Sequence, residues 1–262
     1  MDQRESLRAM LGGAGDDELV AFKADVAAVL APEASGFLVD PAYGGRILAG
    51  DGKAGLIVAA DTLVGTESEV VADARFDDTL DLSGFARAGV AAAKLLVVWR
   101  DDGRTAERVA DAARFVEACR EAGLVSIVEG VVRPITSPTR EAELVSCARA
   151  LGALGPSLYK AEVPYFGRGP AARITDAASA VSAAVGCPWV VLSSHVERAD
   201  FAAAVEACCR GGASGMLAGR ALWTNALSSA DRRATLAAES VPYLRSLSTV
   251  VAADARPWTA VP

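Results

Sequence analysis

Seven short, almost wholly apolar runs recur along the chain, and they constrain its fold more than any other feature. Continuous apolar runs of this length are typical of strands that are buried on both faces of a parallel sheet. Segments with apolar residues at helical spacing separate most of the runs, for example Val109, Ala112, Val116 and Cys119. Alternation of strand and helix predicts an α/β fold. The runs cover residues 36–40, 55–61, 91–99, 126–132, 158–164, 189–194 and 215–220.

The spacing of the later runs favours a closed barrel over an open sheet. Their starts lie 26 to 35 residues apart, the period of one βα unit in a (β/α)8 TIM barrel, and no GxGxxG motif follows the early runs. We predict a single barrel domain over residues 1–262, with a closing helix at about 229–252 and a loose tail at 253–262. Because only seven strands are found, we expect that a strand should precede Asp2 and that the barrel lacks it.

Composition excludes several classes of protein. Of the 262 residues, 52% are hydrophobic, which is enough to bury a sizeable core. A net charge of −7 argues against a nucleic-acid partner. No apolar stretch approaches the roughly 18 to 20 residues that cross a bilayer, and the amino terminus is polar, so we expect a soluble, cytoplasmic protein with no membrane partner.

The number and spacing of cysteines and histidines exclude further kinds of site. The five cysteines lack any CxxC spacing, and His195 is the single histidine. We therefore expect no disulfide framework, no metal site and no cofactor. We also expect a homo-oligomer, because Trp223 and Trp258 are taken as apolar surface residues that could lie in an interface.

Three ionisable residues lie inside runs that consist otherwise of Val, Leu, Ile and Ala, namely Lys94, Glu129 and Lys160. Charges in buried strands are rare unless they are paired or take part in chemistry. Active sites of such barrels lie at the carboxyl ends of the strands, so we regard these three residues as candidate catalytic groups. A purely structural ion pair between Lys94 and Glu129 is the alternative.

Lys160 is the candidate nucleophile. The period of two in residues 158–164 places Lys160 and Glu162 on one face of the strand. If that face is the barrel interior, burial and a neighbouring cation such as Lys94 or Arg220 disfavour the ammonium form, as an amine nucleophile requires at neutral pH. The alternative is a lysine that pairs with Glu162 or extends past an outer helix.

The last two runs end in segments suited to binding an anion. Residues 211–223 are rich in glycine and contain Arg220, and the preceding run ends in LSSHV. In barrels, the loops after the seventh and eighth strands commonly bind phosphate through backbone N–H groups. Glycines allow close approach and Arg220 supplies a charged fork. His195 either donates to the same anion or is an exposed loop residue.

Further polar residues lie at presumed strand ends that face the same mouth of the barrel. Side chains at this edge are candidates for substrate binding. For the aspartates the alternative is turn capping, which we favour for Asp61. The residues concerned are Asp2, Gln3, Arg4, Asp40 and Asp61.

Six segments together resemble the sulfofructose-phosphate aldolases of sulfoglycolysis, within the wider group of class I aldolases that includes tagatose-1,6-bisphosphate aldolase. The resemblance runs in order over nearly the whole chain. Lys94, Glu129 and Lys160 match the wider group, whereas DQRE, KLLVVWR and GRGP match the sulfosugar branch. The segments are DQRESLR at 2–8, KLLVVWR at 94–100, GLVSIVEGVVRP at 123–134, LYKAEVPYFGRGP at 158–170, PWVVLSSHV at 188–196 and GASGMLAGRALW at 212–223.

This resemblance implies roles for individual residues. Lys160 would be the Schiff-base lysine, and Glu129 and Lys94 would assist proton transfer. Gln3 would lie near the sulfonate. The anionic ends of the substrate would be held by Ser193, Ser194, Gly219 and Arg220.

Two departures from the family pattern stand out. His195 replaces an expected glycine in SSGV, which bears on the backbone conformation beside the phosphate loop. The family also carries about twenty residues ahead of DQR that include the first strand, in agreement with the strand count made from the apolar pattern.

The resemblance implies a cofactor-free aldolase that cleaves 6-deoxy-6-sulfofructose 1-phosphate to dihydroxyacetone phosphate and sulfolactaldehyde. Cleavage of tagatose or fructose 1,6-bisphosphate is the alternative among enzymes. A non-catalytic barrel that senses a sugar phosphate is the alternative from another class of protein, although a sensor would not require Lys94, Glu129 and Lys160 together.

Overall fold

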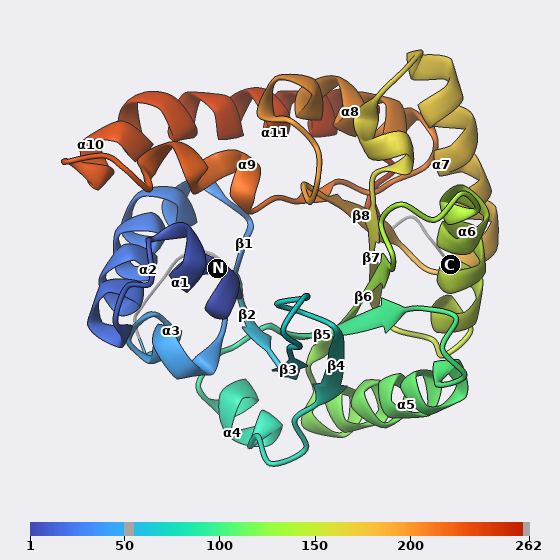
Figure 1. Cartoon of the computed structure of the whole chain (residues 1–262), viewed down its shortest axis with the longest axis horizontal. Helices are drawn as coiled ribbons and strands as arrows, with labels where there is room; N and C mark the ends of the chain where they lie inside the picture. The colour runs from blue at the N-terminus through green and yellow to red at the C-terminus, as the bar shows by residue number, and fades with distance from the viewer. Residues whose placement is uncertain (50–54, 259–262) are drawn as a thin grey trace.

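A parallel sheet that curls on itself forms the centre of the computed structural model, which describes residues 1–49 and 55–258 (Figure 1). Each adjacent pair of its strands is parallel, and each predicted apolar run contains one strand. Within the described residues the sheet has seven strands in the order β1-β2-β5-β6-β7-β8-β9. They are β1 (Gly36–Val39), β2 (Gly55–Ala59), β5 (Ala92–Trp99), β6 (Val125–Val132), β7 (Leu158–Glu162), β8 (Trp189–Leu192) and β9 (Met216–Leu217).

Helices cover the outside of the curled sheet (Figure 1). The apolar residues whose spacing predicted these helices lie on the face that packs against the sheet. In α5, Ala112, Val116 and Cys119 are each at most 3% exposed. This helix ends at Gly123, whose φ of 72° provides a left-handed cap. The long helices are α2 (Asp16–Leu30), α5 (Thr105–Ala122), α6 (Arg140–Gly152), α7 (Ala171–Val185), α8 (Arg198–Arg210) and α11 (Val241–Asp254).

Shorter elements complete the connections. The short helices are α1 (Glu5–Met10), α3 (Pro41–Leu48), α4 (Leu82–Arg87), α9 (Arg220–Trp223) and α10 (Arg232–Thr235). Tight 3₁₀ turns form η1 (Ala31–Glu33), η2 (Pro164–Gly167) and η3 (Thr224–Ala226), and η4 (Leu236–Ser240) is a π-helical turn. Where one closing helix was expected at about 229–252, the chain forms α10, η4 and α11 in succession. Part of the expected tail, residues 259–262, lies outside the described residues.

The sheet is a TIM-barrel-like fold with one strand missing, as the count of apolar runs predicted. In residues 1–49 and 55–258, β1 and β9 are the two edges and do not pair with each other. The amino group of Met1 donates to the carbonyl of Leu38, so the first residue lies beside the β1 edge. None of the described helices combines the length and apolar character needed to cross a membrane.

A hairpin that sequence reasoning did not predict joins β2 to α4. It consists of β3 (Asp61–Val64) and β4 (Asp73–Phe76), which pair antiparallel. Its strands are only four residues long and largely not buried, and apart from Asp61 they lie outside the predicted apolar runs. The hairpin is important for the site because its first residue, Asp61, points at Lys94.

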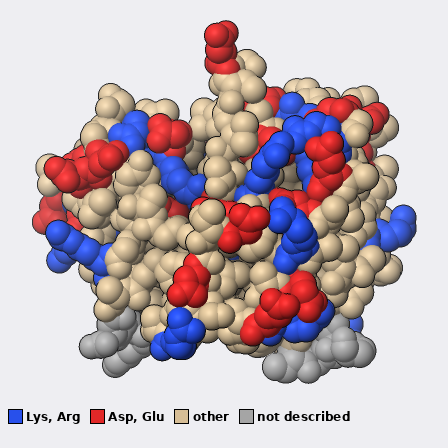
Figure 2. All heavy atoms as spheres, turned by 90° about the horizontal axis from the view of Figure 1, so that it is seen from below, with Lys and Arg blue, Asp and Glu red and all other residues tan. Residues whose placement is uncertain are grey.

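The placement of the two tryptophans differs from the sequence expectation. Trp258 is 49% exposed, but Trp223 is only 1% exposed, so the expectation of Trp223 as a surface residue is wrong. Its ring packs edge-to-face on Phe22 of α2, with 5.7 Å between ring centroids. The face of the molecule in Figure 2 shows acidic and basic side chains interspersed, without a continuous patch of either sign.

Candidate active site

A cavity of about 1040 Å³ occupies the interior and the mouth of the curled sheet. Its walls include the three ionisable strand residues and the segments after β8 and β9. Residues of the edge strands β1 and β9 and apolar residues of α2 and α11 also line it. The sequence-predicted site residues that line it are Asp2, Gln3, Asp61, Lys94, Glu129, Lys160, Ser193, Ser194, His195, Gly219 and Arg220.

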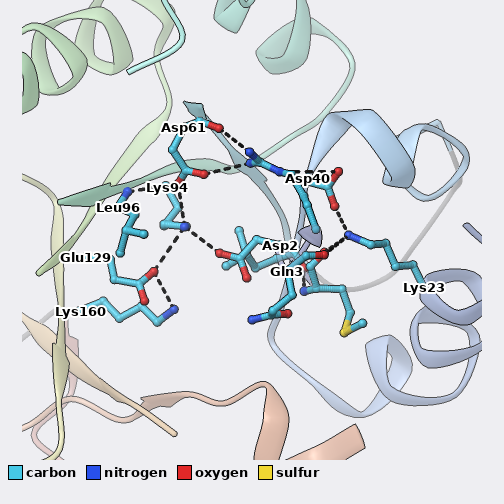
Figure 3. Close-up of polar contacts among 12 residues, drawn as sticks. Asp2, Gln3, Lys23, Asp40, Asp61, Lys94, Leu96, Glu129 and Lys160 are labelled. Carbon is cyan, nitrogen blue, oxygen red and sulfur yellow. Dashed lines mark hydrogen bonds and ion pairs between the residues drawn. The ribbon is translucent and has the colours of Figure 1, made fainter. Parts of the chain in front are cut away.

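Lys94, Glu129 and Lys160 meet in this cavity and, together with Asp2 and Asp61, form what we call the lysine cluster (Figure 3). Strand register explains part of the meeting, because Glu129 of β6 lies directly beside Lys160 of β7. The amine Nζ of Lys160 donates to Glu129 Oε2 at 3.0 Å, and Lys94 Nζ lies 3.3 Å from the same oxygen. One carboxylate oxygen therefore bridges two lysines.

Lys160 faces the cavity and is only 5% exposed. Neither alternative position for it is found: Glu129 and not Glu162 is its partner, and it does not extend past the outer helices. Lys160 is thus placed as a buried amine beside a carboxylate, which is the arrangement that an amine nucleophile and a proton acceptor require.

Lys94 is surrounded by negative charge. Besides Glu129, its Nζ contacts Asp2 Oδ2 at 2.7 Å and Asp61 Oδ2 at 2.8 Å. Burial alone would lower the pKa of Lys94, but the charges of Asp2, Asp61 and Glu129 outweigh it and raise that pKa well above its ordinary value. Lys94 is therefore a fixed cation in the centre of the lysine cluster and not a base.

Asp61 does not cap a turn, contrary to the sequence expectation. Its Oδ2 also accepts the backbone N–H of Leu96 at 3.1 Å, and its Oδ1 accepts from Arg4 Nη2 at 2.9 Å. Arg4, a predicted substrate-binding residue, thereby has its charge paired with Asp61 and is not among the residues that line the cavity. Asp40 does cap a helix, because its Oδ1 accepts the N–H of Tyr43 at the start of α3.

Lys23, which sequence reasoning missed, fixes the segment that carries Asp2 and Gln3. It is fully buried in α2 and donates to the backbone carbonyls of Met1 at 3.0 Å and Gln3 at 2.7 Å, and it also pairs with Asp40 (Figure 3). Its signal in the sequence was present, since one lysine interrupts the apolar face of a helix (DELVAFKADV).

On the opposite side of Lys160, Ser193, Ser194, Gly219 and Arg220 come together, and we call these four residues the anion loop. The N–H of Gly219 donates to Ser193 Oγ at 3.2 Å, and Arg220 donates to Ser194 Oγ. In the described ranges Arg220 forms no ion pair, so its positive charge faces the cavity without a carboxylate partner. Hydroxyls, backbone N–H groups and one guanidinium form a suitable site for an oxyanion.

His195 adjoins the anion loop, and its backbone is unusual. Its φ of 62° is in the left-handed region that favours glycine, at the position where the resembled family has glycine. Its Nδ1 lies 3.0 Å from Ser194 Oγ. The residue is exposed, as one of the two sequence interpretations expected, and its side chain retains 33% exposure. Partial burial of the ring, followed by the charges of Arg220, Arg133 and Arg140, lowers the pKa of His195 to about 4. It is therefore a neutral hydrogen-bonding group at neutral pH.

Two further arginines were missed by sequence reasoning. Glu162, buried on the same strand face as Lys160, accepts the N–H of Val132 at 2.8 Å, and Arg133 and Arg140 lie 3.4 and 3.6 Å from its carboxylate. Arg133 lines the cavity directly after β6. Its position at a strand end in VVRP was the available signal.

Other reactive residues lie apart from the cavity. All five cysteines are free and buried. In residues 1–49 and 55–258, no group of three His, Cys, Asp or Glu side chains is arranged to hold a metal ion.

Comparison with known proteins shows the family to which the chain belongs. The family model described as DeoC/LacD family aldolase matches residues 1–225. The chain belongs to the DeoC/LacD aldolase family. It is therefore an aldolase, a lyase that makes or breaks carbon–carbon bonds.

Solved structures of aldolases share the fold of this DeoC/LacD aldolase at low sequence identity. A Plasmodium falciparum fructose-bisphosphate aldolase is 13% identical with a TM-score of 0.70, over 97% of this chain and 90% of that one. An archaeal fructose-1,6-bisphosphate aldolase, with its catalytic lysine bound to a carbinolamine intermediate, is 17% identical with a TM-score of 0.60, over 91% and 84%. One from Slackia heliotrinireducens is 17% identical with a TM-score of 0.69, over 94% and 74%.

Proposed function

We propose that this aldolase forms a Schiff base between Lys160 and the C2 ketone of 6-deoxy-6-sulfofructose 1-phosphate, and that it cleaves the C3–C4 bond. The products are dihydroxyacetone phosphate and sulfolactaldehyde. The observation that carries the Schiff base is the geometry of Lys160, a buried amine 3.0 Å from a carboxylate and in the same cavity as the anion loop.

Each step uses a group that the cavity provides. Lys160 Nζ, after transfer of its proton to Glu129, adds to C2. Glu129 returns this proton to the carbinolamine hydroxyl, and loss of water leaves an iminium and an ionised Glu129. Glu129 then takes the proton of the C4 hydroxyl, the electrons of the C3–C4 bond move into the iminium, and the aldehyde leaves. The resulting enamine is protonated at C3, and water releases dihydroxyacetone phosphate and restores the amine.

Lys94 assists by charge. As a cation 3.3 Å from Glu129 Oε2, it stabilises the negative charge that this carboxylate carries when it acts as a base. Asp2 and Asp61 keep Lys94 protonated and in position. The proton relay therefore consists of Lys160 and Glu129, with Lys94 as its electrostatic support.

The anionic groups of the substrate supply the positioning. Ser193, Ser194 and the guanidinium of Arg220 hold the phosphate, and the N–H of Gly219 exchanges its bond to Ser193 Oγ for one to a phosphate oxygen. Fixing a ketone against an amine in this way is worth several kcal/mol of the barrier. The sulfosugar as substrate is supported by the DQRE, KLLVVWR and GRGP segments, and the same resemblance places Gln3 near the sulfonate.

A sugar bisphosphate is the second candidate substrate. One observation favours it: Arg133 lines the cavity and shares the carboxylate of Glu162 with Arg140, so the pair of arginines leaves positive charge that a second phosphate dianion would require.

Trapping and turnover together test the proposal. Borohydride reduction with each candidate ketose phosphate, followed by mass spectrometry, should give a covalent adduct on Lys160. Steady-state cleavage of the sulfonated sugar should exceed cleavage of fructose and tagatose 1,6-bisphosphate. Absence of any Lys160 adduct would refute the Schiff base, and faster cleavage of a bisphosphate would refute the sulfosugar.

A further inference from the structure

Trp223 carries a buried hydrogen-bond donor that has no partner. The side chain is 1% exposed, and within the described residues no acceptor lies in hydrogen-bond range of its Nε1. Buried indole N–H groups usually find an acceptor, and leaving one unpaired costs about 1–3 kcal/mol. The edge-to-face contact with Phe22 fixes the ring, so this N–H has a defined direction.

A second polar side chain beside Trp223 is also unpaired. The Gln3 amide has a buried acceptor, Oε1, without a partner in the described part of the chain, and its donor Nε2 is the atom that lies toward Gly219. Both side chains line the cavity that contains Lys160. Lys23 holds the backbone of Gln3 in place through its carbonyl, so the position of this amide is fixed by the fold.

Gly219 lies between these two side chains. A Cβ atom at this residue would lie 3.6 Å from Trp223 Nε1 and 3.7 Å from Gln3 Nε2. Two neutral N–H donors therefore converge on the space beside Gly219. We call this arrangement of Gln3, Gly219 and Trp223 the neutral cradle.

The neutral cradle adjoins the anion loop through a shared residue. The N–H of Gly219 donates to Ser193 Oγ, and the next residue is Arg220. An anion held by Ser193 and Arg220 has further terminal oxygens, each a hydrogen-bond acceptor, and an indole N–H can only donate. Donors on both sides of Gly219 can therefore serve a single oxyanion.

We propose that Trp223 is a substrate-binding residue, and that its N–H and the Gln3 amide bind an oxygen of the phosphate held by the anion loop. This inference rests on the proposed function for the identity of the ligand. It assigns Gln3 to the phosphate-bearing end of the substrate instead of the sulfonate end, because the Gln3 amide lies against Gly219.

Dihydroxyacetone phosphate is the discriminating probe, since it carries the phosphate and no sulfonate. Borohydride trapping on Lys160, followed by mass spectrometry over a range of ligand concentrations, gives the half-saturating concentration for each variant. Trp223→Phe keeps the aromatic packing on Phe22 and removes only the N–H. We expect its half-saturating concentration to rise roughly tenfold or more. With unphosphorylated dihydroxyacetone, Trp223→Phe should match the wild type.

Two further variants keep the test decisive if Trp223→Phe is unstable. Gly219→Ala inserts a methyl group into the neutral cradle at ordinary contact distances, and the φ of −126° at Gly219 imposes no left-handed strain on alanine. We expect the same phosphate-specific weakening. Trp99→Phe removes the N–H of a half-buried tryptophan that does not line the cavity, and it should leave trapping unchanged.

The outcomes separate this inference from the proposed function. Unchanged half-saturation by dihydroxyacetone phosphate, or equal weakening with and without phosphate, would overturn the neutral cradle even if Lys160 is trapped. If the wild type forms no Lys160 adduct, the Schiff base fails. Binding of inorganic phosphate, measured by thermal shift, then decides the cradle: weaker binding to Trp223→Phe supports it, and equal binding overturns it.

Discussion

The two sides of the Lys160 cavity differ in how their charges are balanced. In the lysine cluster, both lysines lie within 3.3 Å of a carboxylate, and Lys94 contacts three of them. In the anion loop, Arg220 contacts a neutral hydroxyl, and the neighbouring Trp223 N–H has no acceptor in the described ranges. Internally satisfied charges suit proton transfer at fixed geometry, whereas unsatisfied donors suit a ligand that brings its own negative charge.

The comparison predicts different kinetic phenotypes on the two sides. Substitutions in the lysine cluster should lower kcat, because they remove groups that act on the reacting atoms. Substitutions in the anion loop should raise KM, because they remove groups that hold the substrate.

The largest effect is expected for Lys160→Ala. Without the amine no iminium forms, so cleavage should fall by roughly 10⁴-fold or more. The fold should persist, since Glu129 keeps Lys94 as its partner. Steady-state kinetics and circular dichroism measure both quantities. Lys160→Arg, which keeps a charge but not the nucleophile, should be equally inactive; cleavage near the wild-type rate in either variant contradicts the assignment.

The next largest effect is expected for Glu129→Gln. The amide cannot accept the C4 hydroxyl proton, so kcat should fall by about 10²- to 10⁴-fold with little change in KM. Glu117→Gln, at a 55% exposed side chain on α5, is the matched control. A rise in KM at constant kcat would move Glu129 from proton transfer to substrate binding and would remove the contrast between the two sides.

Much of this contrast could be predicted from the sequence. Lys94, Glu129 and Lys160 are charges inside apolar strands, and the alternation of strand and helix brings neighbouring strands of a barrel side by side. Period-two alternation also identified the face that Lys160 shares with Glu162. Arg220 was found because the segment after the last strand is rich in glycine.

The parts that could not be predicted depend on contacts distant in sequence. Asp61 was expected to cap a turn, but the unpredicted β3–β4 hairpin directs it to Lys94. Trp223 was expected at the surface, because the pattern of a four-residue helix does not show that Phe22 covers it. Arg133 and Glu162 pair across two strand ends, and nothing local in the sequence specifies that pairing.

A smaller effect is expected for Arg220→Ala. Loss of one charge-assisted contact to the phosphate should raise KM by roughly 10- to 100-fold and change kcat little. Arg210→Ala, at a side chain that is 57% exposed on α8, is the control for loss of a positive charge. If KM for the phosphorylated substrate is unchanged, Arg220 does not belong to the anion site.

The smallest effects are expected from His195, which reports the electrostatics of the anion loop. As the single histidine, it gives one set of imidazole signals in an NMR titration. Its midpoint should lie near pH 4, in line with the pKa that burial and the nearby arginines lower to about 4. Saturating phosphate should raise this midpoint, because a bound anion offsets the charge of Arg220. A midpoint near 6.5 in the free protein would show that the anion loop is not electropositive.

The same pKa shift of His195 has a consequence for stability. Between pH 6.5 and about pH 4 the unfolded chain binds a proton at His195 that the folded protein does not bind. The free energy of unfolding should therefore fall as pH decreases through this window, and below about pH 4 this contribution should become constant. His195→Gln cannot be protonated, so its loss of stability over the window, measured by urea unfolding at several pH values, should be smaller than that of the wild type. Identical slopes would mean that His195 titrates alike in the folded and unfolded chains, and the positive charge assigned to the anion loop would then have to be screened by solvent.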